Sequence, residues 1–199
     1  MLLTVQEGFL WFDYNLWYLI NSVWRNDVLD AVMPFFRNQW TWAPLYLFLL
    51  VYMLRNFGWH GIIWCLFFIG TFALADQISA HFLKEIFQRT RPCNNQNLKE
   101  IVHNIVPCGS GYSFPSSHAA NHFALGVFAA VTLRRYIKGV WTMAMIWAGV
   151  VSYAQVYVGV HFPMDVICGG LLGAVIGRLT AALYHYKFRL QPAGEATVA

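Results

Sequence analysis

The chain has 199 residues, of which 58% are hydrophobic and only 11% are charged, and its mean hydropathy is +0.48. This composition is too apolar for an ordinary soluble domain and indicates an integral membrane protein that forms one compact bundle. The net charge of +4 does not indicate nucleic-acid binding, because the basic residues are scattered between apolar runs. In a membrane protein, such residues indicate how the chain is oriented in the membrane.

The first apolar stretch, residues 2–24, is rich in Phe, Trp, Tyr and Leu but contains the polar residues Asp13, Asn15 and Asn21. Such a mixture is typical of an amphipathic helix in the membrane interface or of a tilted sixth span. We expect an interfacial or partly inserted helix.

Later apolar segments predict membrane-spanning helices. They cover residues 41–54, 59–83, 117–133, 140–160 and 165–184. The first is short for the roughly 20 residues that a span needs, but Gln39 and Trp40 can lengthen it at the interface, where Trp is favoured. The sequence therefore predicts an all-α, polytopic bundle of five to six transmembrane helices with an amphipathic or tilted N-terminal helix. We expect a single domain over residues 1–190 and a disordered tail over residues 191–199.

The basic residues in the connections predict how the bundle is oriented. If successive spans cross the membrane in alternate directions, six basic residues fall on the same side: Arg55, Arg134, Arg135, Lys138, Lys187 and Arg189. By the positive-inside rule that side is cytoplasmic. Three polar segments then share the opposite, extracytoplasmic end.

The first polar segment is Lys84-x6-Arg91-Pro92. Polar residues recur there at spacings of four, three, four and three, which would place them on one face of a continuing helix: Gln77, His81, Lys84, Gln88 and Arg91. Lys84 and Arg91 would then form a clamp for phosphate oxygens, and Pro92 would favour the end of the helix. The alternative is a basic stripe that contacts anionic lipid headgroups.

The second polar segment, Pro115-Ser116-Ser117-His118, precedes an apolar run. A helix that begins here offers unpaired N–H groups and the positive end of its dipole to a phosphate. Ser116 and Ser117 add hydroxyl donors, and His118 in the first turn can give a proton to a bound oxygen. The alternative is a serine N-cap beside an interfacial histidine.

The third polar segment is His161-x3-Asp165, with Pro163 suited to the first turn of a helix. A carboxylate four residues after His161 can accept its second ring N–H, which fixes the tautomer and leaves the other nitrogen free as a nucleophile. The alternative is an Asp helix cap beside a surface histidine.

Cysteines and one buried acid leave further alternatives open. Cys93 and Cys108 bracket a polar loop and are either disulfide-bonded, if the loop is extracytoplasmic, or two free thiols. Cys65 and Cys168 are expected to be small core residues. Asp76, inside the second span, is either a residue for lipid access or a polar contact between helices.

The three segments together resemble the type 2 phosphatidic acid phosphatase superfamily, integral-membrane lipid phosphatases that share their site with vanadium haloperoxidases. The family pattern is Lys-x6-Arg-Pro, Pro-Ser-Gly-His and Ser-Arg-x5-His-x3-Asp. The first motif is complete, but Ser117 replaces Gly in the second. In the third, Ala154 and Gln155 stand in place of Ser-Arg.

The resemblance implies a role for each matching residue. His161 would be the nucleophile that forms a phosphohistidine, Asp165 its orienting group, and His118 the general acid and later the base. The phosphoryl oxygens would be bound by Lys84, Arg91, Ser116 and the backbone N–H near Ser117. No metal or other cofactor is implied.

The missing third-motif arginine predicts a modified phosphate site. We expect Gln155 to remain in the site as a neutral amide donor. Arg89 is a candidate for the absent cation, although its helical position points away from the face of Lys84 and Arg91.

The resemblance implies hydrolysis of a lipid phosphate or pyrophosphate at the extracytoplasmic face of a bacterial inner membrane. The substrates that it suggests are undecaprenyl pyrophosphate, phosphatidylglycerophosphate, phosphatidic acid and lipid A. The alternative is a non-catalytic or specialised phospholipid-binding or transport protein with a modified phosphate cradle. No nucleic-acid partner is expected.

Overall fold

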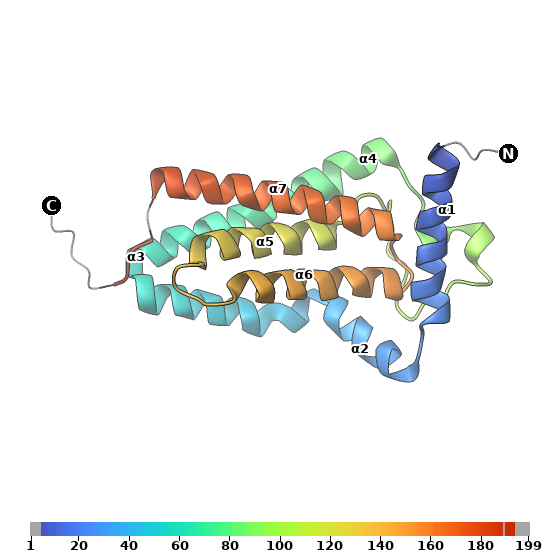
Figure 1. Ribbon diagram of the computed structural model, residues 1–199, viewed down its shortest axis with the longest axis horizontal. Coiled ribbons are helices and arrows are strands. Elements are labelled where there is room, and N and C mark those ends of the chain that lie inside the picture. The colour runs from blue at the N-terminus through green and yellow to red at the C-terminus, as the bar shows by residue number, and fades with distance from the viewer. Residues whose placement is uncertain (1–4, 189, 194–199) are drawn as a thin grey trace.

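The computed structural model describes residues 5–188 and 190–193, with side chains from residue 11 onwards. Its helices are α1 (Val5–Tyr18), α2 (Asp27–Arg37), α3 (Ala43–Asp76), α4 (Lys84–Phe87), α5 (Ser117–Leu133), α6 (Val140–Tyr157) and α7 (Pro163–Lys187). The segments Leu19–Val23 and Gln77–Leu83 are π-helical. The long helices form an elongated bundle with their connections at its two ends (Figure 1), so the all-α prediction is confirmed.

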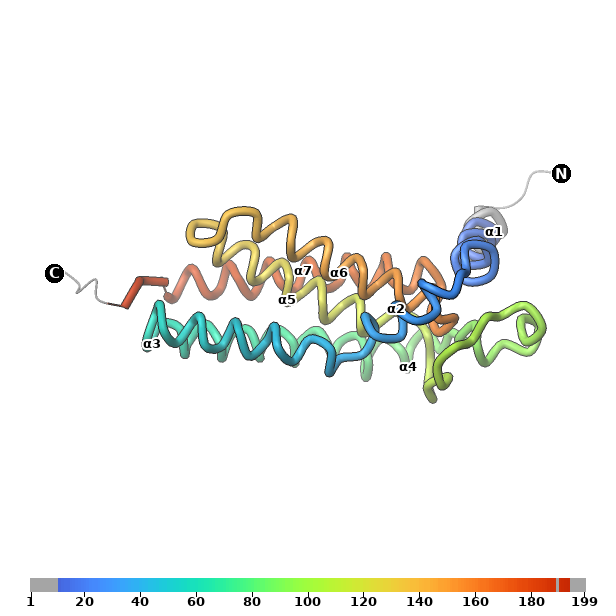
Figure 2. The backbone as a smooth tube through the Cα atoms, turned by 90° about the horizontal axis from the view of Figure 1, so that it is seen from below, coloured from blue at the N-terminus to red at the C-terminus, as the bar shows by residue number. Residues whose placement is uncertain are grey.

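Helix α3 is a hairpin of two arms that run in opposite directions. Gly58 has φ 52° and ψ −122°, a conformation that glycine adopts readily and other residues rarely do. Just beyond it the arms are so close that a Cβ on Gly61 would lie 2.2 Å from the carbonyl oxygen of Met53. The chain reverses at this point and returns along the bundle to α4 (Figures 1 and 2). With α5, α6 and α7, the two arms supply the spans that the sequence predicts.

Helix α5 forms the centre of the bundle, with 14 of its 17 residues buried. It packs against α7 through small residues, which let two backbones approach closely in a membrane. A Cβ added to Gly169, Gly173 or Gly177 would lie 2.4, 2.1 or 2.3 Å from the carbonyl oxygens of Ser116, Ala120 and Ala124, respectively. This contact fixes the start of α7 against the start of α5.

Changing Gly173 to Ala is expected to lower the free energy of unfolding by about 1–3 kcal/mol, because the methyl group meets backbone rather than a movable side chain. The Tm of the purified protein in detergent should fall by roughly 5 °C or more. The matched control is Gly149→Ala on α6, where a Cβ meets nothing within 4 Å; there the better helix propensity of Ala should hold or raise Tm. Equal Tm values for the two variants would contradict the close α5–α7 contact.

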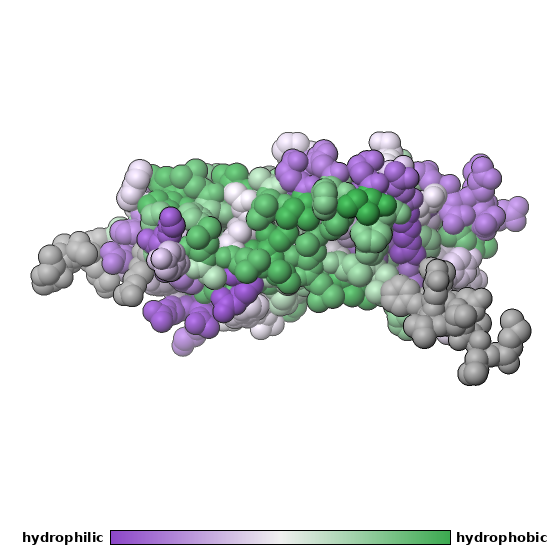
Figure 3. Space-filling model, turned by 90° about the horizontal axis from the view of Figure 1, so that it is seen from above, coloured by the Kyte–Doolittle hydropathy of each residue, from purple (hydrophilic) through white to green (hydrophobic). Residues whose placement is uncertain are grey.

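The outer surface of the long helices is apolar. Large hydrophobic side chains that stand exposed on it include Leu47, Leu66, Ile69, Ile146, Leu171 and Leu179. Hydrophobic residues cover the middle of the face drawn in Figure 3, and hydrophilic residues gather toward its two ends. Two helical stretches, Gln39–Phe87 and Pro163–Lys187, are long and apolar enough to cross a membrane. An apolar surface of this extent is expected where lipid covers the protein.

Helix α1 crosses the end of the bundle instead of running along it (Figures 1 and 2). The side chains of Asp13, Trp17, Ile20 and Asn21 are buried, and their spacing places them on one side of the helix. The Trp17 ring packs against Phe162, with 5.9 Å between ring centroids. These contacts favour the interfacial helix over a sixth span.

The basic connections share the end of the bundle opposite α1. The rings of Phe57 and Tyr136 are 4.9 Å apart, which brings the α3 turn to the α5–α6 loop. The Tyr136 hydroxyl donates to the carbonyl of Leu190 (2.6 Å). Arg189 and residues 194–199 of the predicted tail lie outside the described residues, whereas the Ala193 N–H donates to the Asn56 carbonyl (2.7 Å).

Candidate active site

The three polar segments meet at the end of the bundle that α1 crosses. The Ser116 N–H donates to the Asp165 carbonyl (2.9 Å), which joins the second segment to the third. The Cys93 N–H donates to the Gly159 carbonyl (3.1 Å), which joins the first segment to the loop before α7. The convergence that the topology predicts is therefore present in the fold.

His161 lies at the centre of this region and is only 1% exposed. Its Nδ1 is 3.4 Å from Asp165 Oδ2, and its Nε2 is 3.3 Å from Nη1 of Arg91. Burial lowers the pKa of His161 to about 4, although the Asp165 carboxylate opposes the shift. The imidazole is therefore neutral at pH 7. With the Nδ1 proton on the side of the carboxylate, the lone pair is on Nε2, where it accepts from Arg91 Nη1 in this structure.

Asp165 is held by more partners than His161 alone. The Phe162 N–H donates to its Oδ2 (2.8 Å), and Arg89 Nη1 donates to its Oδ1 (2.7 Å). These bonds fix the carboxylate at the first turn of α7, as expected for an acid at a helix N-terminus. The helix-cap interpretation and the orienting interpretation are thus both compatible with its position.

Arg89 does not face an open phosphate site. Besides Asp165, it pairs with Asp13 Oδ2 at 2.5 Å, and its guanidinium lies 4.1 Å above the centroid of the Phe162 ring. The other Asp13 oxygen accepts from the Met164 N–H (2.8 Å). The idea that Arg89 replaces the third-motif arginine is therefore wrong, because its charge is paired with two carboxylates.

The expected helical stripe through Lys84 and Arg91 is also wrong. The helix ends at Phe87, Gln88 is left-handed (φ 46°), and Arg91 is extended. Residues 77–83 are π-helical, which further changes the spacing of side chains around the axis. Arg91 nevertheless contacts the His161 ring, and the charge of Lys84 contributes with that of Arg91 to the low pKa of His161.

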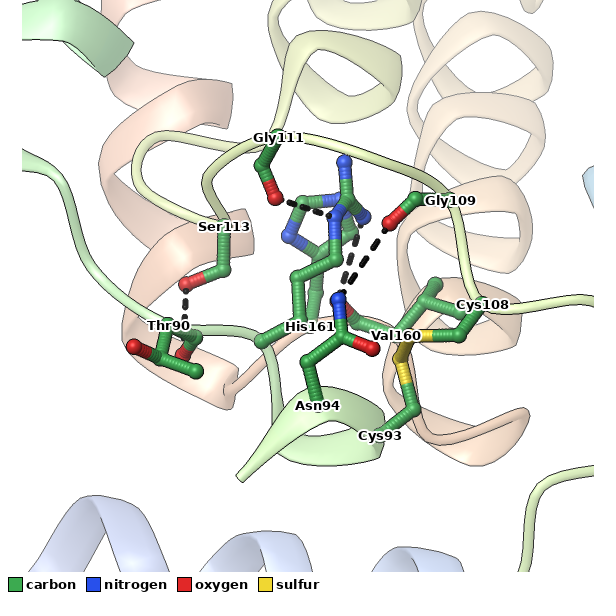
Figure 4. The surroundings of a disulfide bond; sticks show 10 residues. Thr90, Cys93, Asn94, Cys108, Gly109, Gly111, Ser113, Val160 and His161 are labelled. Atoms are coloured by element: carbon green, nitrogen blue, oxygen red, sulfur yellow. Dashed lines mark hydrogen bonds between the residues drawn. A yellow bond between two sulfur atoms is a disulfide. The ribbon is translucent and has the colours of Figure 1, made fainter. Parts of the chain in front are cut away.

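Arg91 is fastened by backbone carbonyls rather than by an acid. Its Nε donates to Gly111 (3.2 Å) and its Nη1 to Val160 (3.3 Å). Figure 4 shows these carbonyls and His161 beside the disulfide between Cys93 and Cys108, which resolves the alternatives left open for this pair. The disulfide ties the loop after Arg91 to the segment that holds the Gly111 carbonyl.

The second segment begins α5 as predicted. Ser116 is the N-cap and its hydroxyl accepts from the Ala119 N–H (3.4 Å), so the capping alternative applies to this residue. The Ser117 hydroxyl is buried without a partner among the described residues. His118 stands in the first turn, within electrostatic range of His161.

A cavity of about 780 Å³ opens beside His118, between the two arms of α3 and α5. Its polar lining consists of Gln39, Asp76, Ser117, His118, Asn121 and His122. The remaining lining is apolar or aromatic and extends along the bundle to residues such as Leu50 and Trp64. The Asn121 amide donates to Asp76 Oδ1 (2.8 Å). Asp76 therefore makes the contact between helices and also borders the cavity.

Gln155 occupies the place of the third-motif arginine and is fully buried. Its backbone carbonyl accepts from the His161 N–H (3.3 Å). Neither its amide oxygen nor its amide nitrogen has a partner among the described residues. No group of three or more His, Cys, Asp or Glu side chains within those residues is arranged to hold a metal ion.

Sequence reasoning missed two residues at this end of the bundle, Asp13 and Arg37. Asp13 could have been found as an acid in an otherwise aromatic stretch, where a buried carboxylate needs a partner. Arg37 follows an amphipathic segment and carries no motif, so its position depends on how α2 folds back.

Comparisons with known proteins agree with this arrangement. The family model described as PAP2 superfamily matches residues 63–189 of this chain. A lipid A 4'-phosphatase of Bacteroides thetaiotaomicron is 32% identical over 87% of this chain and 77% of that protein. An undecaprenyl-diphosphatase of Sulfolobus acidocaldarius is 30% identical over 86% of this chain and 78% of that protein. The crystal structure of a transmembrane PAP2-type phosphatidylglycerolphosphate phosphatase from Bacillus subtilis superposes with a TM-score of 0.71 at 25% identity, covering 92% of this chain and 90% of that one.

Proposed function

This chain belongs to the PAP2 superfamily and is a membrane lipid phosphatase, and from that premise we propose that it works through a phosphohistidine at His161, on the extracytoplasmic face of a bacterial inner membrane. The observation that carries the proposal is the setting of the His161 ring, with one nitrogen toward Asp165 and the other toward Arg91. A neutral, oriented imidazole beside an anion-binding cation is what attack on a phosphoryl group requires.

In the first step His161 Nε2 bonds to phosphorus while the bond from phosphorus to the lipid oxygen breaks. His118 gives a proton to that leaving oxygen, which becomes the hydroxyl of the lipid or, for a pyrophosphate, belongs to the phosphate that stays on the lipid. The Nδ1 proton of His161 stays directed at Asp165, which stabilises the positive charge on the phosphorylated ring.

In the second step His118, now neutral, takes a proton from water. The water oxygen bonds to phosphorus as the bond to His161 Nε2 breaks, which releases inorganic phosphate and restores both histidines. Lys84, Arg91, the Ser117 hydroxyl and the N–H groups at the start of α5 are proposed to bind the phosphoryl oxygens in both steps.

The apolar cavity supports a lipid substrate. It reaches His118 at its polar end, so a chain in the cavity would place its phosphate beside His118 and the start of α5. Phosphatidic acid, phosphatidylglycerophosphate, lipid A and undecaprenyl pyrophosphate all combine such a chain with a phosphate, and the proposal is this class rather than one member.

Two observations support the extracytoplasmic face. The basic connections around Arg55, Arg134 and Lys187 lie at the far end of the bundle, which the positive-inside rule assigns to the cytoplasm. The Cys93–Cys108 disulfide lies at the site end, and disulfides persist in oxidising compartments.

One experiment tests the activity and the face together. Spheroplasts that express the chain receive short-chain phosphatidic acid or farnesyl pyrophosphate from outside, and released phosphate is measured before and after detergent. We expect release before detergent, with little increase afterwards. Release only after detergent would overturn the face, and no release from either compound after detergent would favour the non-catalytic lipid-binding alternative.

A further inference from the structure

We infer that Arg37, in the last turn of α2, supplies the positive charge that the third motif lacks and binds a phosphoryl oxygen in the active site. The inference rests on the proposed function of the site as a phosphate cradle. Because Gln155 stands where the family has an arginine, the cradle lacks one guanidinium. Arg89 does not supply it, since Arg89 forms ion pairs with Asp13 and Asp165.

The fold of α2 turns Arg37 toward the protein. Asn26 caps the helix by accepting from the Leu29 N–H, and Met33 and Phe36 pack in the cluster that contains Trp17. Arg37 follows Met33 by four residues, so the two side chains share a face of the helix. Met33 is 8% exposed, and the arginine one turn later therefore extends along the buried side.

The end of α2 is held at the rim of the active-site cavity. The Trp42 indole N–H donates to the Phe36 carbonyl (2.9 Å), and the two rings stack with centroids 5.9 Å apart. Gln39, two residues after Arg37, lines the same cavity as Ser117 and His118. The chain that directly follows α2 thus lines the cavity that Ser117 and His118 also border.

Arg37 has no counter-ion among the residues that the structure describes. Its Nε is buried without a hydrogen-bond partner, and none of the acids in the described residues lies within salt-bridge distance of it. Burial and the positive charge of Arg91 both lower its pKa, and His118 is within its electrostatic range. Two guanidinium groups that repel each other are stabilised when an anion binds between them.

The contrast with Arg89 makes the assignment specific. Arg89 forms two ion pairs with carboxylates. Arg37 forms no ion pair among the described residues, and a guanidinium can bind two phosphoryl oxygens at once. In the proposed reaction it would stabilise the charge that develops on the transferring phosphoryl group.

The test compares Arg37→Gln with a control variant, Arg25→Gln. The control also removes one arginine charge, but from an exposed residue just before the N-terminus of α2. The kcat/KM for short-chain phosphatidic acid and the Kd for orthovanadate are measured on purified, folded protein, with Tm as the check of folding. We expect Arg37→Gln to lower kcat/KM by roughly 10²–10³-fold and to weaken orthovanadate binding by at least about tenfold, while Arg25→Gln changes neither.

A second variant makes the test independent of any general damage to α2. Gln155→Arg restores the family residue, and in the Arg37→Gln background it should recover at least about tenfold of the lost kcat/KM, since one guanidinium replaces the other. Arg37→Gln and Arg25→Gln proteins with equal orthovanadate affinity would overturn the inference, whatever the activity. If wild type hydrolyses no lipid phosphate, the proposed function fails, and the orthovanadate comparison still decides the role of Arg37.

Discussion

Replacing His161 with Ala is expected to lower kcat/KM for a lipid phosphate by roughly 10⁴-fold or more, because the covalent route loses its nucleophile. The cations around the site remain, so orthovanadate should still bind. The measurement is phosphate release by purified protein, combined with labelling from a ³²P-phosphate ester and rapid denaturation. Wild type should carry acid-labile, alkali-stable label, as a phosphohistidine does, and the variant should carry none.

Two controls make this result specific to His161. His81→Ala removes an exposed histidine from the π-helical segment before Lys84 and should leave the rate unchanged. His161→Gln fills more of the buried site and guards against loss of the fold. Turnover that survives both His161 substitutions would contradict the proposed mechanism.

Replacing His118 with Ala is expected to lower the rate on a lipid phosphate by roughly 10²–10⁴-fold, because the departing lipid oxygen no longer receives a proton. With an aryl phosphate such as p-nitrophenyl phosphate, the leaving group is p-nitrophenolate, which departs without that proton. With this substrate, the first turnover of the variant should stay fast while the second step, which needs His118 as a base for water, becomes slow. The phosphorylated form of His161 should therefore accumulate.

The measurement is a stopped-flow burst of p-nitrophenol, compared with the labelled protein recovered after denaturation. A burst of about one equivalent per protein, followed by a slow steady state, is expected for the His118 variant. If the first turnover of the aryl phosphate falls as far as that of the lipid phosphate, His118 is not the general acid.

Helix α1 has a part in this site that its composition alone does not reveal. Asp13 joins α1 to Arg89 and to the Met164 N–H at the start of α7. Asn21, at the far end of the same buried face, donates to the carbonyls of Tyr157 and His103. The interfacial helix is thus fixed by hydrogen bonds to the segments on both sides of His161.

Much of the fold could be predicted from local pattern. Runs of apolar residues separated by basic connections predict the spans and their order, because a membrane requires each crossing to satisfy its own backbone hydrogen bonds. The starts of α5 and α7 were also predicted, since Ser116 and Pro163 favour helix N-termini for local steric and hydrogen-bonding reasons.

Long-range geometry could not be predicted in the same way. The pattern of Lys84 and Arg91 fits a continuous α-helix, but the chain becomes π-helical and the helix then ends at Phe87, with Gln88 in a left-handed conformation. The spacing of residues along the sequence predicts a shared helix face only where the helix keeps its regular α-helical period. The two cations approach His161 because a loop tied by backbone bonds and a disulfide returns Arg91 to the site.

The sequence by itself determined the chemical inventory and the end of the bundle where it gathers: two histidines, a carboxylate and cations in an order that resembles one family, within an apolar chain. Only the tertiary structure decided which arginine is available for a phosphate. Arg89 is neutralised by Asp13 and Asp165, whereas Arg37 is half-buried and forms no ion pair with an acid of the described residues. The physical reason is that the use of a charge depends on its nearest partners in space, and those partners come from segments as far apart in sequence as α1 and α7.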